Sequence, residues 1–190
     1  MSDISTNDIK QGMKLEIENQ PYLVISNEFV KPGKGQAFNR IRVKHLQSGR
    51  SIEKTYKSGE KLSLADVQEM RMRLLYLDQN EAVFMSDETF EQMHIPFTAI
   101  KETKKWLKDD IIYDIIFYKG EAIEILPPTF MDLKIVETNP GVRGDTASGR
   151  VLKPAILETG ANISIPIFIE QGEIIKVDTR TAEYVSRSQS

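Results

Sequence analysis

Apolar and polar residues alternate with a period of two over much of this chain, and that alternation restricts the fold more than any other feature. In residues 38–46, Ile41 and Val43 alternate with the basic residues Arg40, Arg42 and Lys44. A strand of this kind is half-buried, with one apolar face and one cationic face. Shorter runs of the same pattern, separated by turn residues, predict further antiparallel strands at residues 14–18, 22–25 and 51–57. We therefore expect residues 1–63 to form a small barrel of about five strands.

The alternation of apolar and polar residues, interrupted by turn residues, continues to the end of the chain. Hairpins are predicted for residues 69–77 with 81–85 and for 111–118 with 121–126, and strands for 130–137, 151–157, 161–169 and 173–178. Only residues 87–93 and 103–107 could form helical turns. The pair Pro127-Pro128 interrupts the pattern as a linker would. We predict an all-β chain of three small barrels with domains at 1–63, 64–127 and 128–190.

The composition excludes several classes of site. The chain has no cysteine, so it can form neither a disulfide framework nor a cysteine zinc site, and no thiol nucleophile is present. With only two histidines, we expect no metal centre, and we expect no cofactor. The N-terminus lacks the apolar run of a signal peptide, and no stretch approaches the ~20 apolar residues of a membrane span. We expect a cytoplasmic protein with no membrane partner.

The net charge of −3 hides an asymmetry along the chain. Residues 1–63 hold 11 Lys/Arg against 7 Asp/Glu, whereas residues 64–127 hold 7 against 13. The basic excess is densest in residues 28–57, which carry eight Lys/Arg and only two acids. One end of the chain is therefore suited to a polyanion, and the acidic middle block would limit nonspecific adhesion to it.

Within the basic block, residues 31–38 read KPGKGQAF and place Lys34 between two glycines. Glycine admits positive φ and brings no side chain, so the stretch predicts a tight turn that carries its lysine outward. It is not a phosphate-binding P-loop, because no Ser or Thr follows Lys34 and the glycines run into a strand. The simplest interpretation is a hairpin turn with a solvated lysine. A more specific alternative is that Lys34 forms a Schiff base with a substrate. A glycine-flanked tip, however, offers little of the burial that such chemistry needs.

A binding role for folded RNA accounts for more of these features. Lys31 and Lys34 in the turn, with Arg40, Arg42 and Lys44 on the outer face of the next strand, would form a cationic end suited to phosphates. Aromatic residues beside them are few, which favours recognition of backbone and shape over stacking on single-stranded bases.

Blocks along nearly the whole chain resemble the bacterial elongation factor P family: EFVKPGKGQAF, IEKTYKSGEK, ETFEQ, PPTF, GDTASG, KPAILETGA, PIFIEQGE and IKVDTRTAEYVSR. The resemblance implies an SH3-like N-terminal domain with the Lys34 loop, an acidic OB-like domain and a C-terminal OB-like domain, in an L-shaped, tRNA-like arrangement. It further implies a noncatalytic, monomeric translation factor that binds both ribosomal subunits beside the peptidyl-tRNA. Such a factor stimulates peptide-bond formation at consecutive prolines.

The resemblance also assigns roles to single residues. Lys34 is where the family places a tip lysine that many members extend with a β-lysyl group, which implies a lysine-modifying enzyme as a partner. The tRNA-facing set is Lys31, Pro32, Gly33, Lys34, Gly35, Arg40, Arg42 and Lys44. The loop that approaches the exit site is Gly144, Asp145, Thr146, Ala147 and Gly149, and the C-terminal ribosome contacts are Tyr184 and Arg187.

Three departures from the family pattern and two alternative functions stay open. Ala182 stands where we expect glycine, which matters only if that turn requires a positive φ. Asn39 and the segment HIPFTAIKETKKW at residues 94–106 are individual to this chain. The first alternative is an elongation factor P-like paralogue with a narrower, regulatory ribosomal role. The second is a generic cytoplasmic RNA-binding protein.

Overall fold

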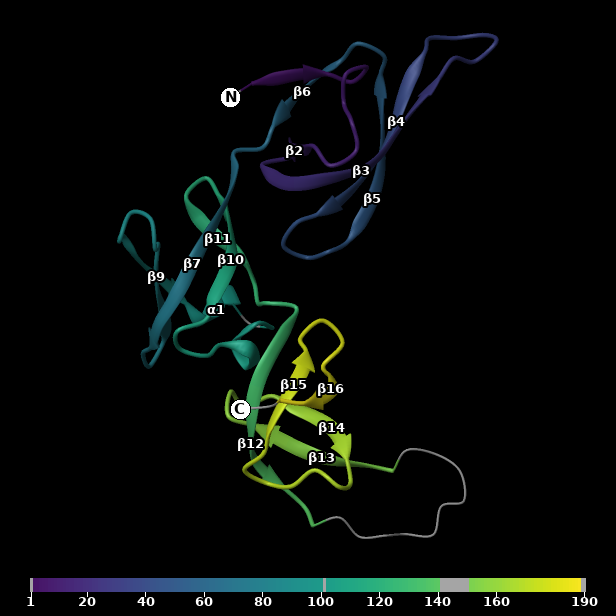
Figure 1. The fold of residues 1–190 in the computed structure, drawn as a ribbon. Helices are drawn as coiled ribbons and strands as arrows, with labels where there is room; N and C mark the ends of the chain where they lie inside the picture. Colours follow the sequence, from purple (N-terminus) through teal and green to yellow (C-terminus); the bar gives the residue numbers. More distant parts are fainter. Residues whose placement is uncertain (1, 101, 141–150, 189–190) are drawn as a thin grey trace. The chain divides into compact units, whose positions relative to one another are not determined.

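A computed structural model of the chain describes residues 2–100, 102–140 and 151–188, and these residues are mostly β-strands (Figure 1). The chain divides into two compact units, Met1–Met70 with Ile115–Glu124 and Arg71–Asp114 with Ile125–Ser190. Among the described residues, no helix is both long and apolar enough to cross a membrane. The all-β fold class is confirmed, whereas the boundaries of the three domains stay a prediction.

The N-terminal sheet has six strands in the order β1-β6-β2-β3-β4-β5, and all its neighbouring strands pair antiparallel. Their bounds are β1 Asp3–Ser5, β2 Lys14–Ile17, β3 Gln20–Val30, β4 Phe38–His45, β5 Ser51–Lys57 and β6 Lys61–Leu64. The two strands that the sequence did not indicate, β1 and β6, have three and four residues, which is too short to show an alternation.

The predicted alternation in β4 is confirmed. Ile41 and Val43 are fully buried, and Arg40, Arg42 and Lys44 are exposed. The buried side chains join those of β2 and β3 in one apolar core, which consists of Ile9, Leu15, Ile17, Val24, Ile41 and Val43. Burying these side chains at about 1.5–3 kcal/mol each fixes which face of β4 turns outward, because a slip of one residue would exchange the two faces.

The second sheet has five strands in the order β11-β10-β7-β8-β9. Both predicted hairpins are present, with strands β7 Val67–Leu77, β8 Glu81–Met85, β10 Ile112–Tyr118 and β11 Glu121–Leu126. The fifth strand, β9 Gln92–Pro96, pairs with β8 and was not predicted.

The helical turn predicted at residues 87–93 is wrong. The Ser86 hydroxyl accepts hydrogen bonds from the amides of Glu88 and Thr89, as a helix N-cap does. The turn then stops because Phe90 adopts a φ of 59°, and β9 follows two residues later. The turn at 103–107 is confirmed as the 3₁₀ helix η1 Lys104–Trp106, and the short helix α1 Phe97–Ile100 was not predicted.

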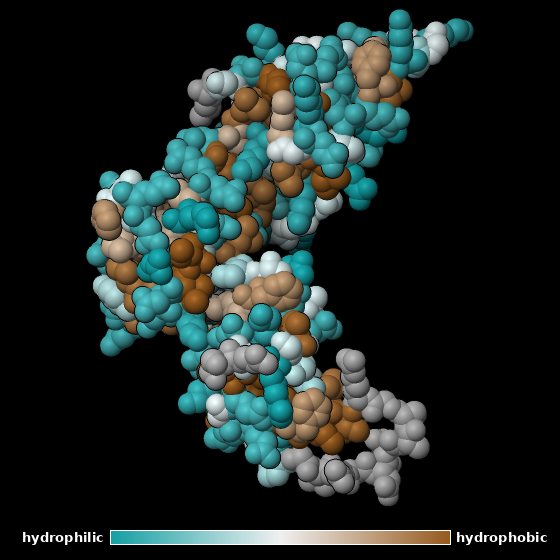
Figure 2. All heavy atoms as spheres, viewed as in Figure 1, coloured by the Kyte–Doolittle hydropathy of each residue, from teal (hydrophilic) through white to brown (hydrophobic). Residues whose placement is uncertain are grey.

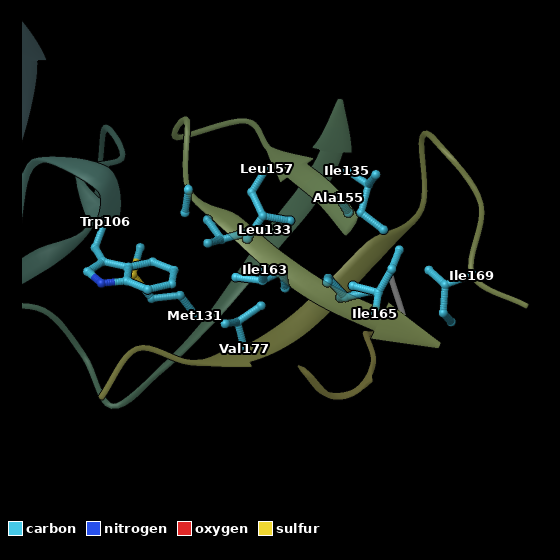
Figure 3. Close-up of a cluster of buried hydrophobic side chains, with 12 residues drawn as sticks. Trp106, Met131, Leu133, Ile135, Ala155, Leu157, Ile163, Ile165, Ile169 and Val177 are labelled. Atoms are coloured by element: carbon cyan, nitrogen blue, oxygen red, sulfur yellow. The ribbon is translucent and has the colours of Figure 1, made fainter. Parts of the chain in front are cut away.

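The C-terminal strands form a closed barrel in the order β12-β13-β14-β16-β15. Their bounds are β12 Phe130–Thr138, β13 Leu152–Leu157, β14 Asn162–Pro166, β15 Ile174–Asp178 and β16 Glu183–Arg187, of which only β16 was not predicted. Figure 3 shows the core of this barrel, with Trp106 of η1 beside Met131 of β12. Closing the sheet on itself removes the free edges that an open sheet would expose.

The turn before β16 contains a backbone conformation that suits glycine, yet Ala182 occupies it with a φ of 57°. The turn therefore has the positive φ that makes the choice of residue at this position matter. Left-handed backbone costs a residue with a Cβ about 1–2 kcal/mol, and glycine avoids that cost while losing more chain entropy on folding.

We expect Ala182→Gly to raise the free energy of unfolding by about 0.5–1 kcal/mol, measured by urea denaturation. The matched control is Ala155→Gly in β13, where the alanine is buried in the barrel core and the same change should lower it by about 1 kcal/mol. Equal destabilisation by both changes would show that the turn does not depend on glycine-like freedom.

Candidate nucleic-acid interface

The feature that stands out in the N-terminal sheet is the hairpin between β3 and β4. Figure 1 shows these two strands running to a loop at the far end of their sheet, and β4 stays paired with β5 up to its first residue, Phe38. The last paired residues are Val30 and Phe38, so residues 31–37 form an unpaired loop, which we call the tip loop. One backbone hydrogen bond, from Ser58 N to Ala37 O at 3.1 Å, ties the end of this loop to the end of β5. The prediction that KPGKGQAF joins two strands is confirmed.

Lys34 is exposed near the middle of the tip loop. No carboxylate of a described residue lies within ion-pair distance of its Nζ or of the Nζ of Lys31. Both ammonium groups are therefore available to an anion from outside the chain.

The two glycines beside Lys34 play different structural roles. Gly35 has a φ of 108°, a conformation that side chains rarely adopt, and a Cβ there would lie 3.8 Å from Pro32 Cγ. Gly33 does not have a positive φ, and a Cβ built on it would meet nothing within 4 Å. Of the two glycines, only Gly35 therefore holds a backbone conformation that favours glycine.

The outer face of β4 carries the predicted basic side chains, but they are not equivalent. The Arg40 guanidinium pairs with two cross-strand carboxylates, Glu28 on β3 and Glu53 on β5, each at 3.5 Å. Arg42 and Lys44 form no ion pair with any described residue. Exposed pairs of this kind contribute about 0–1 kcal/mol, so a phosphate could displace either acid from Arg40.

Sequence reasoning missed a second polar cluster in the same compact unit. The largely buried Glu16 carboxylate accepts hydrogen bonds from the Tyr118 hydroxyl at 2.7 Å and from Lys119 Nζ at 3.2 Å. The bond from Tyr118 holds the pKa of Glu16 below its usual value. Lys119 Nζ also donates to Asn19 Oδ1 at 2.8 Å. The cluster anchors the β10–β11 hairpin to the β2–β3 hairpin, and no local sequence signal points to it because its partners lie about a hundred residues apart.

The remaining predicted site residues lie in the C-terminal part of the chain. The loop of Gly144, Asp145, Thr146, Ala147 and Gly149 lies outside the described residues. Tyr184 is half-buried against the barrel core. Arg187 makes contacts within the barrel: Nε lies 2.9 Å from Glu173 Oε2, Nη2 donates to Phe168 O at 3.1 Å, and the guanidinium lies 5.3 Å from the centre of the Phe168 ring. These contacts give Arg187 a structural role of its own.

Figure 2 shows hydrophilic residues over most of the visible surface, with apolar residues gathered in small patches. The strand topology, the exposed lysine loop and the cationic strand together define an all-β protein that presents a basic loop on one of its sheets. Family models match along the chain: the elongation factor P KOW-like domain at residues 5–62, the elongation factor P OB domain at 67–125 and the elongation factor P C-terminal domain at 131–187. The chain belongs to the elongation factor P family of translation factors.

Curated relatives span the same length. Elongation factor P 2 of Protochlamydia amoebophila is 62% identical over 190 residues and covers 100% of both chains. Elongation factor P 2 of Chlamydia trachomatis is 57% identical over 187 residues, 98% of each chain.

Solved structures with a similar fold include an eIF-5A family protein from Naegleria fowleri, with a TM-score of 0.56 and 13% identity over 66% of this chain and 95% of that one. Initiation factor 5A from Methanococcus jannaschii has a TM-score of 0.52 and 18% identity over 66% of this chain and 94% of that one.

The difference between the two tip glycines can be tested by substitution. We expect Gly35→Ala to lower the free energy of unfolding by about 1 kcal/mol, because alanine must take up left-handed backbone there. Gly33→Ala is the matched control and should leave stability unchanged or slightly higher, because its backbone and surroundings accept a Cβ. Urea denaturation of both variants measures the difference, and equal effects would contradict the assignment.

Proposed function

We propose that this protein binds the ribosome beside the peptidyl-tRNA and stimulates peptide-bond formation at consecutive prolines, with the ribosome performing the chemistry. The observation that carries the proposal is Lys34, exposed in the tip loop that joins β3 to β4 beyond their last paired residues, with no ion-pair partner among the described residues. Family membership supplies the setting, which is translation in the cytoplasm.

The hairpin suits the task of reaching a crowded anionic site. Only the tip loop lies beyond the paired strands, and it adds no bulky side chain beside Lys34, so an ammonium group can be delivered where a wider element would clash. Lys31, Arg42 and Lys44 lie on the same hairpin and offer further charge to RNA phosphates. We infer that these residues face the peptidyl-tRNA, with Arg40 joining them when a phosphate displaces its carboxylates.

In this proposal, the protein acts by positioning the peptidyl-tRNA. Proline's ring fixes φ, which makes it a poor participant in the geometry of peptide transfer. A factor that holds the peptidyl-tRNA in a productive arrangement removes part of the entropic barrier without taking part in the bond changes. The exposure of Lys34 fits this role, and it also leaves the Nζ accessible to an enzyme that would extend the side chain with a β-lysyl group.

Other contacts would orient the molecule on the ribosome. The loop of Gly144, Asp145, Thr146, Ala147 and Gly149 is proposed to approach the exit site on the small subunit, with Tyr184 and Arg187 as a further contact. Because Arg187 already stacks on Phe168 and pairs with Glu173, we propose that it acts by presenting this Phe168 and Arg187 surface rather than as a free cation. We propose that the protein acts as a monomer.

A second candidate is a paralogous factor with a narrower, regulatory role on the ribosome. The observation in its favour is that both relatives described above are named elongation factor P 2. Exchanging residues 31–38 between this chain and a main-type factor, followed by reporter translation, separates the two. A generic RNA-binding protein would instead bind free tRNA as tightly as it binds ribosomes.

The test is translation of a reporter with consecutive prolines in a purified system. We expect the protein to relieve the stall, and Lys34→Ala to lose about tenfold or more of that stimulation because the positioning contact is gone. Lys61→Ala removes an exposed lysine of the same domain on β6, a strand that pairs with β1 and β2 and not with the hairpin, and should act like the parent.

If unmodified protein is inactive, protein from its native host is tested next, with peptide mass mapping of Lys34. Failure of that sample to relieve the stall overturns the proposal.

A further inference from the structure

Three side chains of the basic block have no role assigned by the strand pattern or by the family resemblance. They are Arg50, Lys54 and Lys57. Lys54 Nζ pairs with the Glu18 carboxylate. Arg50 lies in the turn after β4, where its carbonyl accepts from the amide of His45, the residue of β4 farthest from the tip loop. Of the three, only Lys57 lies at the tip-loop end of the sheet.

The strand register places Lys57 at the base of the tip loop. Lys57 is the last residue of β5 and is paired with Phe38, the first residue of β4. Directly opposed residues of an antiparallel pair have their side chains on the same face, with Cβ atoms about 4.5–5.5 Å apart. Because side chains alternate along β5, Lys57 shares its face with Thr55, which is paired with Arg40. The Lys57 side chain therefore starts beside the tip loop, on the face that carries the basic side chains of β4.

Hydrogen bonds hold the backbone of Lys57 in this place. Its N–H donates to Glu60 Oε2 at 2.9 Å, and its carbonyl accepts from Thr6 Oγ1 at 3.1 Å. The next residue, Ser58, donates its N–H to Ala37 O of the tip loop at 3.1 Å. The position of Lys57 relative to the loop is thus set from both sides, whereas the lysines of the tip loop belong to an unpaired segment.

The ammonium group of Lys57 is open to an anion. Lys57 is exposed, and no carboxylate of a described residue lies within ion-pair distance of its Nζ. The acids that pair with Arg40, Glu28 and Glu53, lie farther along the strands from the tip loop. The row of the outer face next to the loop consists of Val30, Phe38 and Lys57. This row carries a cation and no acid.

We propose that Lys57 binds a backbone phosphate of RNA and so anchors the base of the tip loop on it. Lys31 and Lys34 would meet other phosphates of the same RNA segment. Phosphate contacts fix the register and orientation of a protein on a nucleic acid without reading its bases. A lysine on an ordered backbone suits this task, because less conformational entropy is lost when it binds than for a lysine in an unpaired loop. The inference deepens the proposed function and rests on it for the choice of RNA as the partner.

The first measurement uses the full chain without ribosomes and titrates a short RNA duplex at several salt concentrations. The logarithm of the association constant falls linearly with the logarithm of the salt concentration, with a slope set by the number of phosphates contacted. We expect Lys57→Gln to weaken binding at low salt at least about threefold and to reduce the slope by about one. Lys57→Arg keeps the charge and should restore both values.

Lys134→Gln is the matched control for this titration. It removes an exposed lysine from β12 of the C-terminal barrel that also has no ion-pair partner among the described residues. Affinity and slope should stay those of the parent, and melting temperatures show whether each variant folds. The proposal is refuted if the parent does not bind the duplex at low salt, or if Lys57→Gln leaves the slope unchanged.

The second measurement repeats the reporter translation with the concentration of the protein varied. An anchor contributes to binding and not to the final placement of the tip, so Lys57→Gln should raise the concentration for half-maximal stimulation at least about threefold and leave the maximum unchanged. Lys34→Ala should instead lower the maximum. A lowered maximum for Lys57→Gln would contradict the anchoring role. If the parent itself fails to relieve the stall, the proposed function fails, and the duplex titration still decides whether Lys57 binds phosphate.

Discussion

The antiparallel pairing of β3 with β4 is the constraint on which the N-terminal half of this protein depends. The pairing runs from Tyr22 and His45 in the sheet to Val30 and Phe38 at the base of the tip loop. The inner half of the ladder is held by Val24, Ile41 and Val43, which are buried in the core. Because the backbone hydrogen bonds continue from that anchored part to Val30 and Phe38, the strands keep their register up to the base of the tip loop. The position of Lys34 therefore depends on the buried core side chains that hold this ladder in register.

One alternating pattern serves two purposes along β4. At Ile41 and Val43, the inward positions bury apolar side chains, and the outward positions carry charge. Further along the same inward row, where β4 is still paired with both β3 and β5, the row carries the buried Asn39 and, across the ladder, the exposed Phe29. The Asn39 amide is held by a hydrogen-bond chain that reaches back to Thr6 and Ile9, which ties the base of the hairpin to the N-terminal segment.

Strand β4, both hairpins of the second sheet and the position of the tip loop could be predicted because long runs of alternation and turn residues encode them locally. Strands β1, β6, β9 and β16 could not, since each has only three to five residues and is defined by its partner. The prediction of a helical turn at residues 87–93 was wrong for another reason. The Ser86 hydroxyl does cap a turn, but the positive φ of Phe90 ends it before a helix can form. The basic side chains of the candidate site were predicted, whereas the ion pairs of Arg40 and the cluster around Glu16 depend on register between distant segments.

Positioning by a hairpin requires an ordered base, and the two tip glycines differ in what they contribute to it. Gly35 holds a backbone conformation that other residues rarely adopt, at the point where the chain turns back into β4. Gly33 holds no such conformation, and a Cβ there would meet nothing within 4 Å. The preference for glycine therefore lies after Lys34 and not before it. Ordering the free lysine side chain on binding costs about 1.5–2 kcal/mol, whereas a turn already ordered at Gly35 leaves less backbone entropy to be lost at that step.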